Sequence, residues 1–376
     1  MTIEKIDKST VYCRSCNTVV NKYTSIRKGF PLYIWPLPKE ETTRLDDVLL
    51  YVCDHCGHMQ LQKMDQEFIS QIYRDKAFNI ENFDQNISRY KILTKGNLNL
   101  FDNTKVLEIG GGRNSFTGVL PIESEKWGAD FSVDEDVSLN LKGKFIGDFL
   151  DLEIREKDFD YIFMFHVLEH FNHPGLALEK IKKLLKERGK LIIEVPNFSV
   201  ESEQIPYYTL FHMHISLFTK ESLISFLGRY GFTCNNFYIN DSVLLAEFCF
   251  DDNASNAKIN TNSLAQVHNL ENNIRRYHLI LKKKFKDVRS GSVAIFGAGG
   301  ATTLFLFNFP FLIDKISCAL DNDKNKIGRF LCNGKIPIIH PGDIDRNTVD
   351  YIIVLNNNHI GLMVDNTFKY ISIEKL

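Results

Sequence analysis

The chain has 376 residues, enough for two to three domains of ordinary size. Its 45 lysine and arginine residues nearly balance its 47 aspartate and glutamate residues, and a formal charge of −2 does not suit a dedicated nucleic-acid binder. The charged N-terminus lacks the apolar core of a secretory signal, and the most apolar long run, residues 301–313, is too short to span a bilayer. We therefore expect a soluble, cytoplasmic protein without nucleic-acid or membrane partners, and its oligomeric state stays open.

Half of the eight cysteines form two Cys-x-x-Cys pairs near the N-terminus. A two-residue gap lets two thiolates reach one ion from a tight turn, and two such turns complete a tetrahedral four-sulfur site. The pattern favours a structural zinc ion over redox thiols or unrelated buried cysteines, because four thiolates leave no position for a reacting water. His55 and His58 could replace a ligand, but we expect them to be ordinary surface residues. The predicted zinc ligands are Cys13, Cys16, Cys53 and Cys56.

A first nucleotide-binding pattern begins with "TKVLEIGGGRNSF", residues 104–116, which runs from an apolar strand through a glycine turn toward a helix. Gly110 and Gly112 would let the backbone approach a ligand closely. Asp130 ends the next strand, 22 residues after Glu108, where an acid can bind both ribose hydroxyls. In the alternative reading, Glu108 stabilises the turn and the glycines are structural.

Three further strands are predicted downstream of this turn. Asp148 follows the first of them, and "DYIFMFHVLEHFNHP" (160–174) contains a buried strand, a loop with Glu169 and His170, and the start of a helix. "RGKLIIEVPN" closes the series as a fifth strand behind a helix that we expect to end near Arg188. Parallel strands alternating with helices predict a doubly wound α/β domain.

These residues resemble the class I S-adenosylmethionine-dependent methyltransferases, through "LEIGGG", "FHVLEH" and "LLKERGKLIIEVPN" in that order. The resemblance implies that Gly110 and Gly112 line the methionine part of the cofactor, that Asp130 binds its ribose, and that Asp148 lies near its adenine. His170 and Asn197 are implied to bind substrate. The full set of implied cofactor-binding residues is Glu108, Gly110, Gly112, Asp130, Asp148, His166 and Glu169.

A second strand–glycine–helix pattern follows an asparagine-rich linker (251–262) and a predicted long helix (264–288). "SVAIFGAGGATTLFLF" carries Gly297 and Gly299, and Asp321 ends the next strand. With the later strands "IPIIHP" and "YIIVLNN", it predicts a second, smaller doubly wound domain. This domain could bind a second nucleotide or be a structural remnant. Because "GAGG" lacks the full dinucleotide spacing, the nucleotide part of a sugar-nucleotide substrate is a better ligand than a nicotinamide cofactor.

The order of parts resembles the sugar-nucleotide C-methyltransferase family over nearly the full chain. "CDHCGHMQL" is similar to its second cysteine pair, and "GAGG…DNDKNKIGR…IPI" is similar to its terminal domain, which helps hold the nucleotide sugar. The implied architecture is α/β, with two Rossmann-like doubly wound domains preceded by a small zinc-binding module. We expect that module and its helical linker at 1–75, the methyltransferase domain at 76–252, and a linker helix with the substrate-binding domain at 253–376.

The resemblance places the catalytic base of the family in "FHMHIS", residues 211–216. Its members carry a Tyr-His-Glu-His motif here, followed by serine, and take from it the base that removes a proton beside a ketone. The resemblance makes His214 the base and His212 a second catalytic residue, while Phe211 and Met213 replace the tyrosine and the glutamate. A substitute hydroxyl could come from Tyr73, implied catalytic, from Tyr207, or from Tyr208, implied to bind substrate.

The residues alone leave the roles of His212 and His214 open. In an extended strand both side chains would share a face, and in a helix they would lie about 200° apart. A metal site is disfavoured because two histidines make half a site and no nearby Cys, Asp or Glu completes it. His214 is therefore predicted to be a base or a substrate hydrogen-bonding group, with a structural polar residue as the alternative.

The main prediction is methyl transfer from S-adenosylmethionine to a carbon of a nucleotide-linked keto deoxysugar, through an enolate. A first alternative is methylation of a sugar or glycan hydroxyl, which needs only one base and tolerates Phe211 and Met213. A second alternative is a zinc-module binding protein whose methyltransferase fold is inert. The intact glycine turn and Asp130 argue against that second alternative.

Overall fold

A computed structural model describes residues 10–20, 23–62, 72, 83–112, 115–131, 140–199, 210–239, 243–251, 262–345, 347–355 and 369–373. The chain divides into two compact units that are not contiguous in sequence. The first unit comprises residues 1–24, 50–198 and 213–263, and the second comprises 25–49, 199–212 and 264–376. Residues 25–49 and 199–212 therefore group with the C-terminal part of the chain, although a contiguous division would assign them elsewhere.

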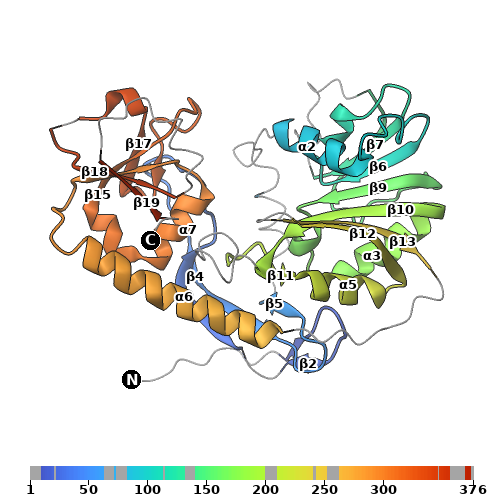
Figure 1. Cartoon of the computed structure of the whole chain (residues 1–376), viewed down its shortest axis with the longest axis horizontal. Helices are drawn as coiled ribbons and strands as arrows, with labels where there is room; N and C mark the ends of the chain where they lie inside the picture. Colours follow the sequence, from blue (N-terminus) through green and yellow to red (C-terminus); the bar gives the residue numbers. More distant parts are fainter. Residues whose placement is uncertain are drawn as a thin grey trace. The chain divides into compact units, whose positions relative to one another are not determined.

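The first unit is built on a seven-stranded sheet in the order β12-β13-β10-β9-β6-β7-β8 (Figure 1). The strands β6 to β10 are parallel, whereas β13 is antiparallel to both β10 and β12. This mostly parallel order confirms the predicted doubly wound α/β fold. The strands are β6 (Lys105–Ile109), β7 (Glu125–Asp130), β8 (Leu141–Ile146), β9 (Phe159–Phe165), β10 (Leu185–Pro196), β12 (Phe232–Ile239) and β13 (Val243–Phe250).

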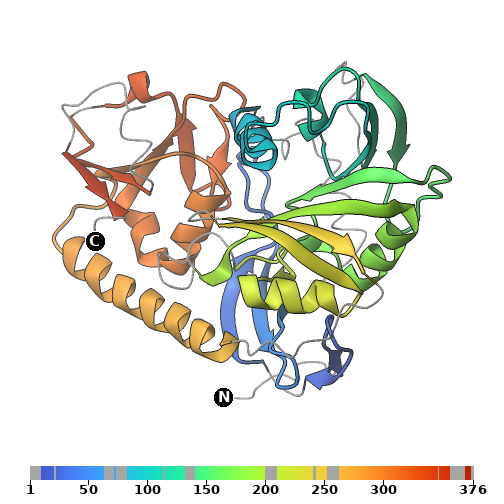
Figure 2. The same cartoon turned by 45° about the vertical axis from the view of Figure 1, so that its right-hand side comes forward.

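Helices cover both faces of this sheet, because alternate residues of each strand point to opposite sides. On one face, Ile162 and Met164 pack with helices α3 (Pro174–Leu184) and α5 (Lys220–Gly228). On the other, Phe163 packs with helix α2 (Phe83–Thr94) and the short η2 (Phe116–Val119). Two views show these layers (Figure 1; Figure 2). The strands therefore read as continuous apolar runs in the sequence.

The junction of α3 and β10 differs from the prediction. The helix ends at Leu184 rather than near Arg188, and β10 begins directly at Leu185, which pairs with Phe159. Arg188 has a φ of 64°, a left-handed conformation that a helix interior does not accept, and the strand register shifts between Leu185 and Lys190. The prediction was wrong because the apolar residue at 185 belongs to the sheet.

The two cysteine pairs lie on turns between short strands. Strands β1 (Val11–Tyr12) and β2 (Val19–Val20) form one antiparallel pair. A further sheet has the order β11-β5-β4-β3. Strand β5 therefore lies between β4 and β11, and β11 comes from the "FHMHISLF" part of the chain. The strands are β3 (Ser25–Pro31), β4 (Leu45–Val52), β5 (Met59–Leu61) and β11 (Ser216–Leu217).

The second unit carries a six-stranded sheet in the order β16-β17-β15-β14-β18-β19, parallel except at β16. It confirms the second doubly wound fold. Helix α6 (Ser263–Lys284) and helix α7 (Gly300–Asn308) share one core with the sheet. Its strands are β14 (Val293–Phe296), β15 (Ile316–Leu320), β16 (Phe330–Leu331), β17 (Ile336–Ile339), β18 (Tyr351–Val354) and β19 (Lys369–Ser372). Short helices are η4 (Pro310–Lys315) and η5 (Pro341–Asp343).

The segment between the cysteine pairs packs into this second unit, which explains why it groups there. Arg27 forms an ion pair with Glu271 of α6 at 2.8 Å. The backbone of Leu37 exchanges two hydrogen bonds with that of Phe330, at 3.0 and 2.8 Å. Contacts far apart in sequence thus decide the division of the chain.

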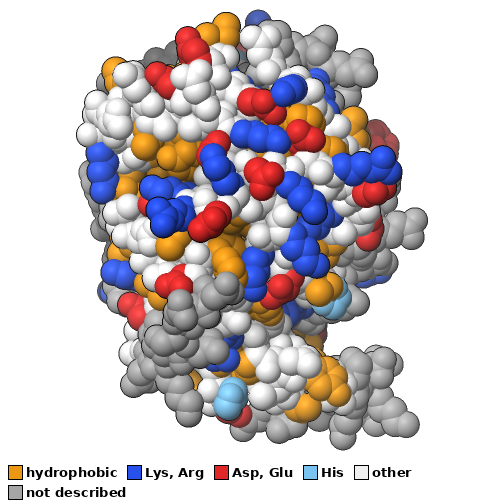
Figure 3. Space-filling model, turned by 90° about the vertical axis from the view of Figure 1, so that its right-hand side faces the viewer, with side chains coloured by type: hydrophobic (Ala, Val, Ile, Leu, Met, Phe, Trp, Pro, Cys, Tyr) orange, Lys and Arg blue, Asp and Glu red, His pale blue; other side chains and the backbone are white. Residues whose placement is uncertain are grey.

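Two observations concern the described helices and the charges on one face of the molecule. Among the described helices, none is both long and apolar enough to cross a bilayer. On the face drawn in Figure 3, lysine and arginine side chains lie interspersed with aspartate and glutamate rather than in one basic field. Charges of both signs are therefore mixed on that face.

A buried ion pair joins α2 to the sheet. The Arg89 guanidinium binds Glu194 of β10, and both side chains are less than a tenth exposed. His166 Nε2 lies 3.0 Å from the same Glu194 carboxylate. Although burial favours the neutral acid, His166 and Arg89 outweigh it and lower the pKa of Glu194 to about 2.

We expect Glu194→Gln to lower the free energy of unfolding by about 3–5 kcal/mol near pH 6, because it leaves a buried arginine uncompensated. Urea denaturation measures this change. The pKa of Glu194 lies below its ordinary value of 4.5, so its contribution is full above that value and is lost as pH falls toward 2. The control Glu153→Gln breaks an exposed pair with Arg155 and should cost less than about 1 kcal/mol. Equal effects in the two variants would contradict the prediction.

Candidate functional site

The residues predicted to bind cofactor and substrate follow the carboxyl ends of parallel strands in the first unit. Gly110 follows β6, Asp130 ends β7, Asp148 follows β8, and His166 follows β9. Asn197 directly follows β10 and is buried. Carboxyl ends of parallel strands meet at one edge, where open α/β sheets bind their ligands. The topology therefore brings these predicted residues to a single edge of the sheet.

The glycine turn after β6 requires glycine at two positions. Gly110 has a φ of 78°, and a Cβ there would lie 2.2 Å from Val167 Cγ2. Gly112 has a φ of 53°, and its backbone N–H donates to Asp130 Oδ2 at 3.0 Å. The loop after β9 thus packs on the glycine turn, and Asp130 orients that turn from the neighbouring strand.

Glu108 has the contacts of a turn-stabilising residue, which is the alternative reading of the sequence. Its carboxylate is buried and accepts backbone N–H bonds from Phe116 at 2.8 Å and Thr117 at 3.0 Å, together with the hydroxyl of Ser115. Burial raises the pKa of Glu108 despite these hydrogen bonds. The described contacts hold the start of η2, and its cofactor-binding role stays a prediction.

Histidines and carboxylates cluster after β9. His166 has a φ of 54°, and its Nδ1 lies 3.3 Å from Glu169 Oε1. Partial burial favours the neutral ring, but Glu169 and Glu194 outweigh it and raise the pKa of His166 to about 9. His170 Nε2 lies 3.8 Å from Glu169 Oε1, and the His170 ring centroid lies 5.0 Å from that of His214. The structure therefore brings together four residues of the predicted site.

The "FHMHIS" stretch is a turn that leads into β11, so neither regular geometry considered from the sequence applies. His212 Nε2 lies 3.3 Å from the carbonyl oxygen of Phe30, within the second unit. The Met213 carbonyl instead accepts a 2.7 Å hydrogen bond from His170 Nδ1, within the first unit. His212 and His214 thus have different neighbours, and burial lowers the pKa of His212.

The sequence argument against a metal near His214 was incomplete. It found no Cys, Asp or Glu nearby, yet Glu169, His170 and His214 each place a ligand atom within 4.8 Å of the others. The separation of 43 positions between His170 and Met213 hid this proximity. Two other predicted site residues, Tyr73 and Tyr208, lie outside the described part of the chain.

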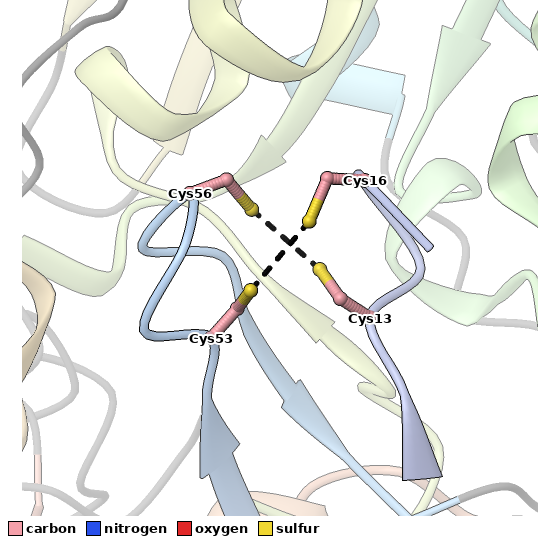
Figure 4. Close-up of side chains that lie close together, drawn as sticks. All are labelled: Cys13, Cys16, Cys53 and Cys56. Atoms are coloured by element: carbon pink, nitrogen blue, oxygen red, sulfur yellow. Dashed lines mark hydrogen bonds between the residues drawn. The ribbon is translucent and has the colours of Figure 1, made fainter. Parts of the chain in front are cut away.

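The four paired cysteines converge on one centre (Figure 4). The Sγ atoms of Cys13 and Cys56 are 3.5 Å apart, and those of Cys16 and Cys53 are 3.6 Å apart. The hydroxyl of Thr18 lies 3.3 Å from Cys53 Sγ. Hydrogen bonding with Cys13 lowers the pKa of Cys53, whereas hydrogen bonding with Cys53 raises that of Cys13. Sulfurs this close fit the thiolate set of a tetrahedral metal site, so these four residues could hold a metal ion.

One of the two nearby histidines differs from its prediction. His55 is exposed as expected, but His58 is only 2% exposed and stacks on Phe226 with ring centroids 5.6 Å apart. Burial lowers the pKa of His58 to about 3, which keeps the ring neutral. The surface prediction was wrong because β5 and α5 enclose the turn that carries His58.

In the second unit, the residues of the predicted nucleotide site mainly contact one another. Asp321 follows β15 and accepts a 2.8 Å hydrogen bond from the Ala298 N–H, while Lys326 Nζ lies 3.0 Å away. Gly297 has a φ of 91°, and a Cβ at Gly299 would meet no atom within 4 Å. The Asp321 carboxylate after β15 therefore orients the glycine turn that follows β14, as Asp130 orients the glycine turn of the first unit.

Comparison with known proteins adds to this geometry. Residues 73–235 match the family model of a methyltransferase domain, and this range contains the five parallel strands β6 to β10. This part of the chain is therefore similar to a methyltransferase domain. Residues 253–372 match the family model of a C-methyltransferase C-terminal domain.

The individual relatives are distant. An uncharacterised protein of Methanocaldococcus jannaschii is 31% identical over 133 residues, which are 32% of this chain and 55% of that protein. The chain thus spans little more than half of that relative's length. A Pyrococcus horikoshii protein has 18% identity and a TM-score of 0.38, over 50% of this chain and 100% of its own. The Burkholderia thailandensis 1,6-didemethyltoxoflavin-N1-methyltransferase was solved with 1,6-didemethyltoxoflavin and S-adenosylhomocysteine. It has 17% identity and a TM-score of 0.40, over 54% of this chain and 94% of its own.

The methyltransferase domain offers groups that fit S-adenosylmethionine. Positive φ angles at Gly110 and Gly112 turn the chain sharply at the sheet edge, where the backbone can approach a ligand. The Asp130 carboxylate stands at the end of β7, where an acid can accept ribose hydroxyls, and Asp148 stands at the end of the next strand. These residues would hold the cofactor.

We expect Gly110→Ala to lower the free energy of unfolding by about 2–4 kcal/mol, because a Cβ forces both a left-handed alanine and a clash with Val167. The matched control is Gly228→Ala, where a Cβ would meet no atom within 4 Å, and its effect should stay within about 0.5 kcal/mol. Urea denaturation of both variants tests the difference. If the two alanines cost the same, the glycine turn is not constrained as described.

Proposed function

We propose that the chain transfers a methyl group from S-adenosylmethionine to the carbon beside the keto group of a nucleotide-linked deoxysugar. The observation that carries the proposal is the pair of imidazoles of half-buried His170 and buried His214, at the edge that also holds the glycine turn. The match of residues 253–372 to a C-methyltransferase C-terminal domain supports carbon as the acceptor. Binding of the nucleotide part by Gly297, Gly299 and Asp321 stays a prediction.

In this mechanism, His214 accepts the proton from the carbon beside the ketone, and the electrons of that C–H bond form the enolate. S-adenosylmethionine supplies the methyl group when bound and leaves as S-adenosylhomocysteine. His170 has a fixed tautomer, because its Nδ1 must donate to the Met213 carbonyl, and its Nε2 can therefore accept a hydrogen bond. We assign His170 to hold the substrate, and alignment of the two carbons is the main contribution of the protein.

One observation favours a second candidate, methylation of a sugar hydroxyl. Phe211 and Met213 are 5% and 2% exposed, and their apolar side chains supply neither a proton donor nor an electrostatic partner for an enolate. Transfer to a hydroxyl needs only one base, which His214 provides.

Proton exchange separates the two candidates. The protein is incubated with 4-keto nucleotide sugars in heavy water without methyl donor, and the sugar protons are followed by NMR. We expect the proton beside the ketone to wash out, and His214→Ala to slow this exchange by about 100-fold or more. His268→Ala, at an exposed histidine of α6, is the matched control and should retain the exchange.

Two outcomes would contradict the proposal. Transfer of the methyl group to a hydroxyl, with no exchange in any keto sugar, favours the second candidate. Calorimetry that detects no binding of S-adenosylmethionine favours an inert fold over both.

We also propose that the four-cysteine centre holds a structural zinc ion that positions His214. Strand β5 follows the second cysteine pair and pairs with β11 in the register Ser216 to Gln60 and Leu217 to Met59. Four thiolate ligands leave no open position, so the ion holds the turns that carry β1 and β5. The segment from Met213 to Leu217 would depend on it.

We expect Cys53→Ser to remove the zinc ion of the cysteine centre, which lowers the zinc content by one ion per chain, and to lower the melting temperature, because a structural zinc site contributes folding energy directly. Metal analysis and thermal denaturation measure both effects. Cys249→Ser, at a cysteine outside the centre in the same unit, is the control and should keep one zinc ion per chain. Equal zinc content in the two variants would refute the assignment.

A further inference from the structure

Three side chains of metal-ligand type converge beside the methyltransferase sheet, away from the cysteine centre. Glu169 and His170 belong to η3 (Leu168–His170), directly after β9, and His214 precedes β11. One ligand atom from each lies within 4.8 Å of the other two. The side chains of Glu169 and His170 are 1% and 13% exposed, and His214 is 6% exposed. The group is therefore almost entirely shielded from water.

The tautomer of His170 determines what faces Glu169. A carbonyl oxygen can only accept, so the 2.7 Å contact between His170 Nδ1 and the Met213 carbonyl places a hydrogen on Nδ1. In the neutral ring, Nε2 then carries a lone pair, and it lies 3.8 Å from Glu169 Oε1. Burial lowers the pKa of His170, which opposes a second proton on that ring. The lone pair of His170 Nε2 and the carboxylate oxygen Glu169 Oε1 thus lie close together in the protein interior.

Few groups around the Glu169 carboxylate stabilise its negative charge. Neither of its oxygens accepts a hydrogen bond in the structure, although His166 Nδ1 lies 3.3 Å from Oε1 as an ion-pair partner. His166 also pairs with Glu194, so its charge is shared between two carboxylates. A buried carboxylate normally requires a full set of donors or a bound cation.

We propose that Glu169, His170 and His214 form a second metal site, which takes a divalent transition ion of the zinc and cobalt type. Two imidazoles and one carboxylate are a ligand set of three-ligand zinc sites, and they leave an open coordination position. Mg²⁺ and Ca²⁺ prefer oxygen ligands and do not suit this set. The Met213 carbonyl fixes the His170 ring from the second nitrogen, as the surroundings of metal-bound histidines commonly do.

Occupation of this site excludes one role of His214. A neutral imidazole has a single nitrogen lone pair, and a metal that takes it leaves none to accept a proton. The metal site stands on the geometry alone, but this consequence rests on the proposed function, in which His214 is the base. We therefore expect a bound transition ion to inhibit proton exchange at the substrate carbon.

Cobalt absorption tests the site in the full-length chain, after its cysteine centre has been loaded with zinc. Titration with Co²⁺ should produce weak visible bands without the sulfur-to-cobalt charge-transfer band that a thiolate site gives, and should saturate at one further ion per chain. Glu169→Gln should weaken this binding about tenfold or more. His170→Gln provides an independent variant, and circular dichroism verifies the fold of both.

Glu153→Gln, an exposed carboxylate in the same unit, is the matched control and should bind Co²⁺ as the natural chain does. The proposal is overturned if the natural chain takes up no cobalt beyond the cysteine centre, or if both site variants bind it equally well. If cobalt binds there and proton exchange continues unchanged, the metal site is supported and the assignment of His214 as base fails.

Discussion

The antiparallel pairing of β5 with β11 is the interaction on which the candidate site depends. The Leu61 N–H donates to the Ile215 carbonyl at 3.0 Å, and Arg14 Nη1 donates to the same carbonyl at 3.3 Å and to that of Leu61 at 2.7 Å. Both Arg14 and β5 belong to the cysteine module. Contacts from Arg14 and β5 therefore fix the backbone of Ile215, which directly follows His214.

A series of contacts connects Met213 to the edge of the methyltransferase sheet. The Met213 carbonyl holds His170, which faces Glu169, and Glu169 pairs with His166. His166 in turn contacts the Glu194 carboxylate, which also pairs with the Arg89 guanidinium of α2. His166 therefore pairs with two carboxylates, Glu169 and Glu194.

The elements that the sequence predicted well are those whose signals are local. A glycine that must adopt a positive φ at Gly110, an acid at the end of the next strand at Asp130, and a two-residue cysteine spacing all depend on neighbouring residues. The misplaced end of α3 and the buried ring of His58 were missed for the opposite reason. Pairing with Phe159 in one case and enclosure by Phe226 in the other come from distant parts of the chain.

The sequence by itself determined the α/β class, the two glycine turns and the four-cysteine set, because strand periodicity, backbone freedom and ligand spacing are written in short segments. Only the tertiary structure decided which polar groups meet. It separated His212 from His214 across a turn, and it brought Glu169 and His170 to His214 from another strand end. These contacts depend on the order of strands in the sheet and on the pairing of β5 with β11. No pattern within a short segment of the sequence encodes either of them.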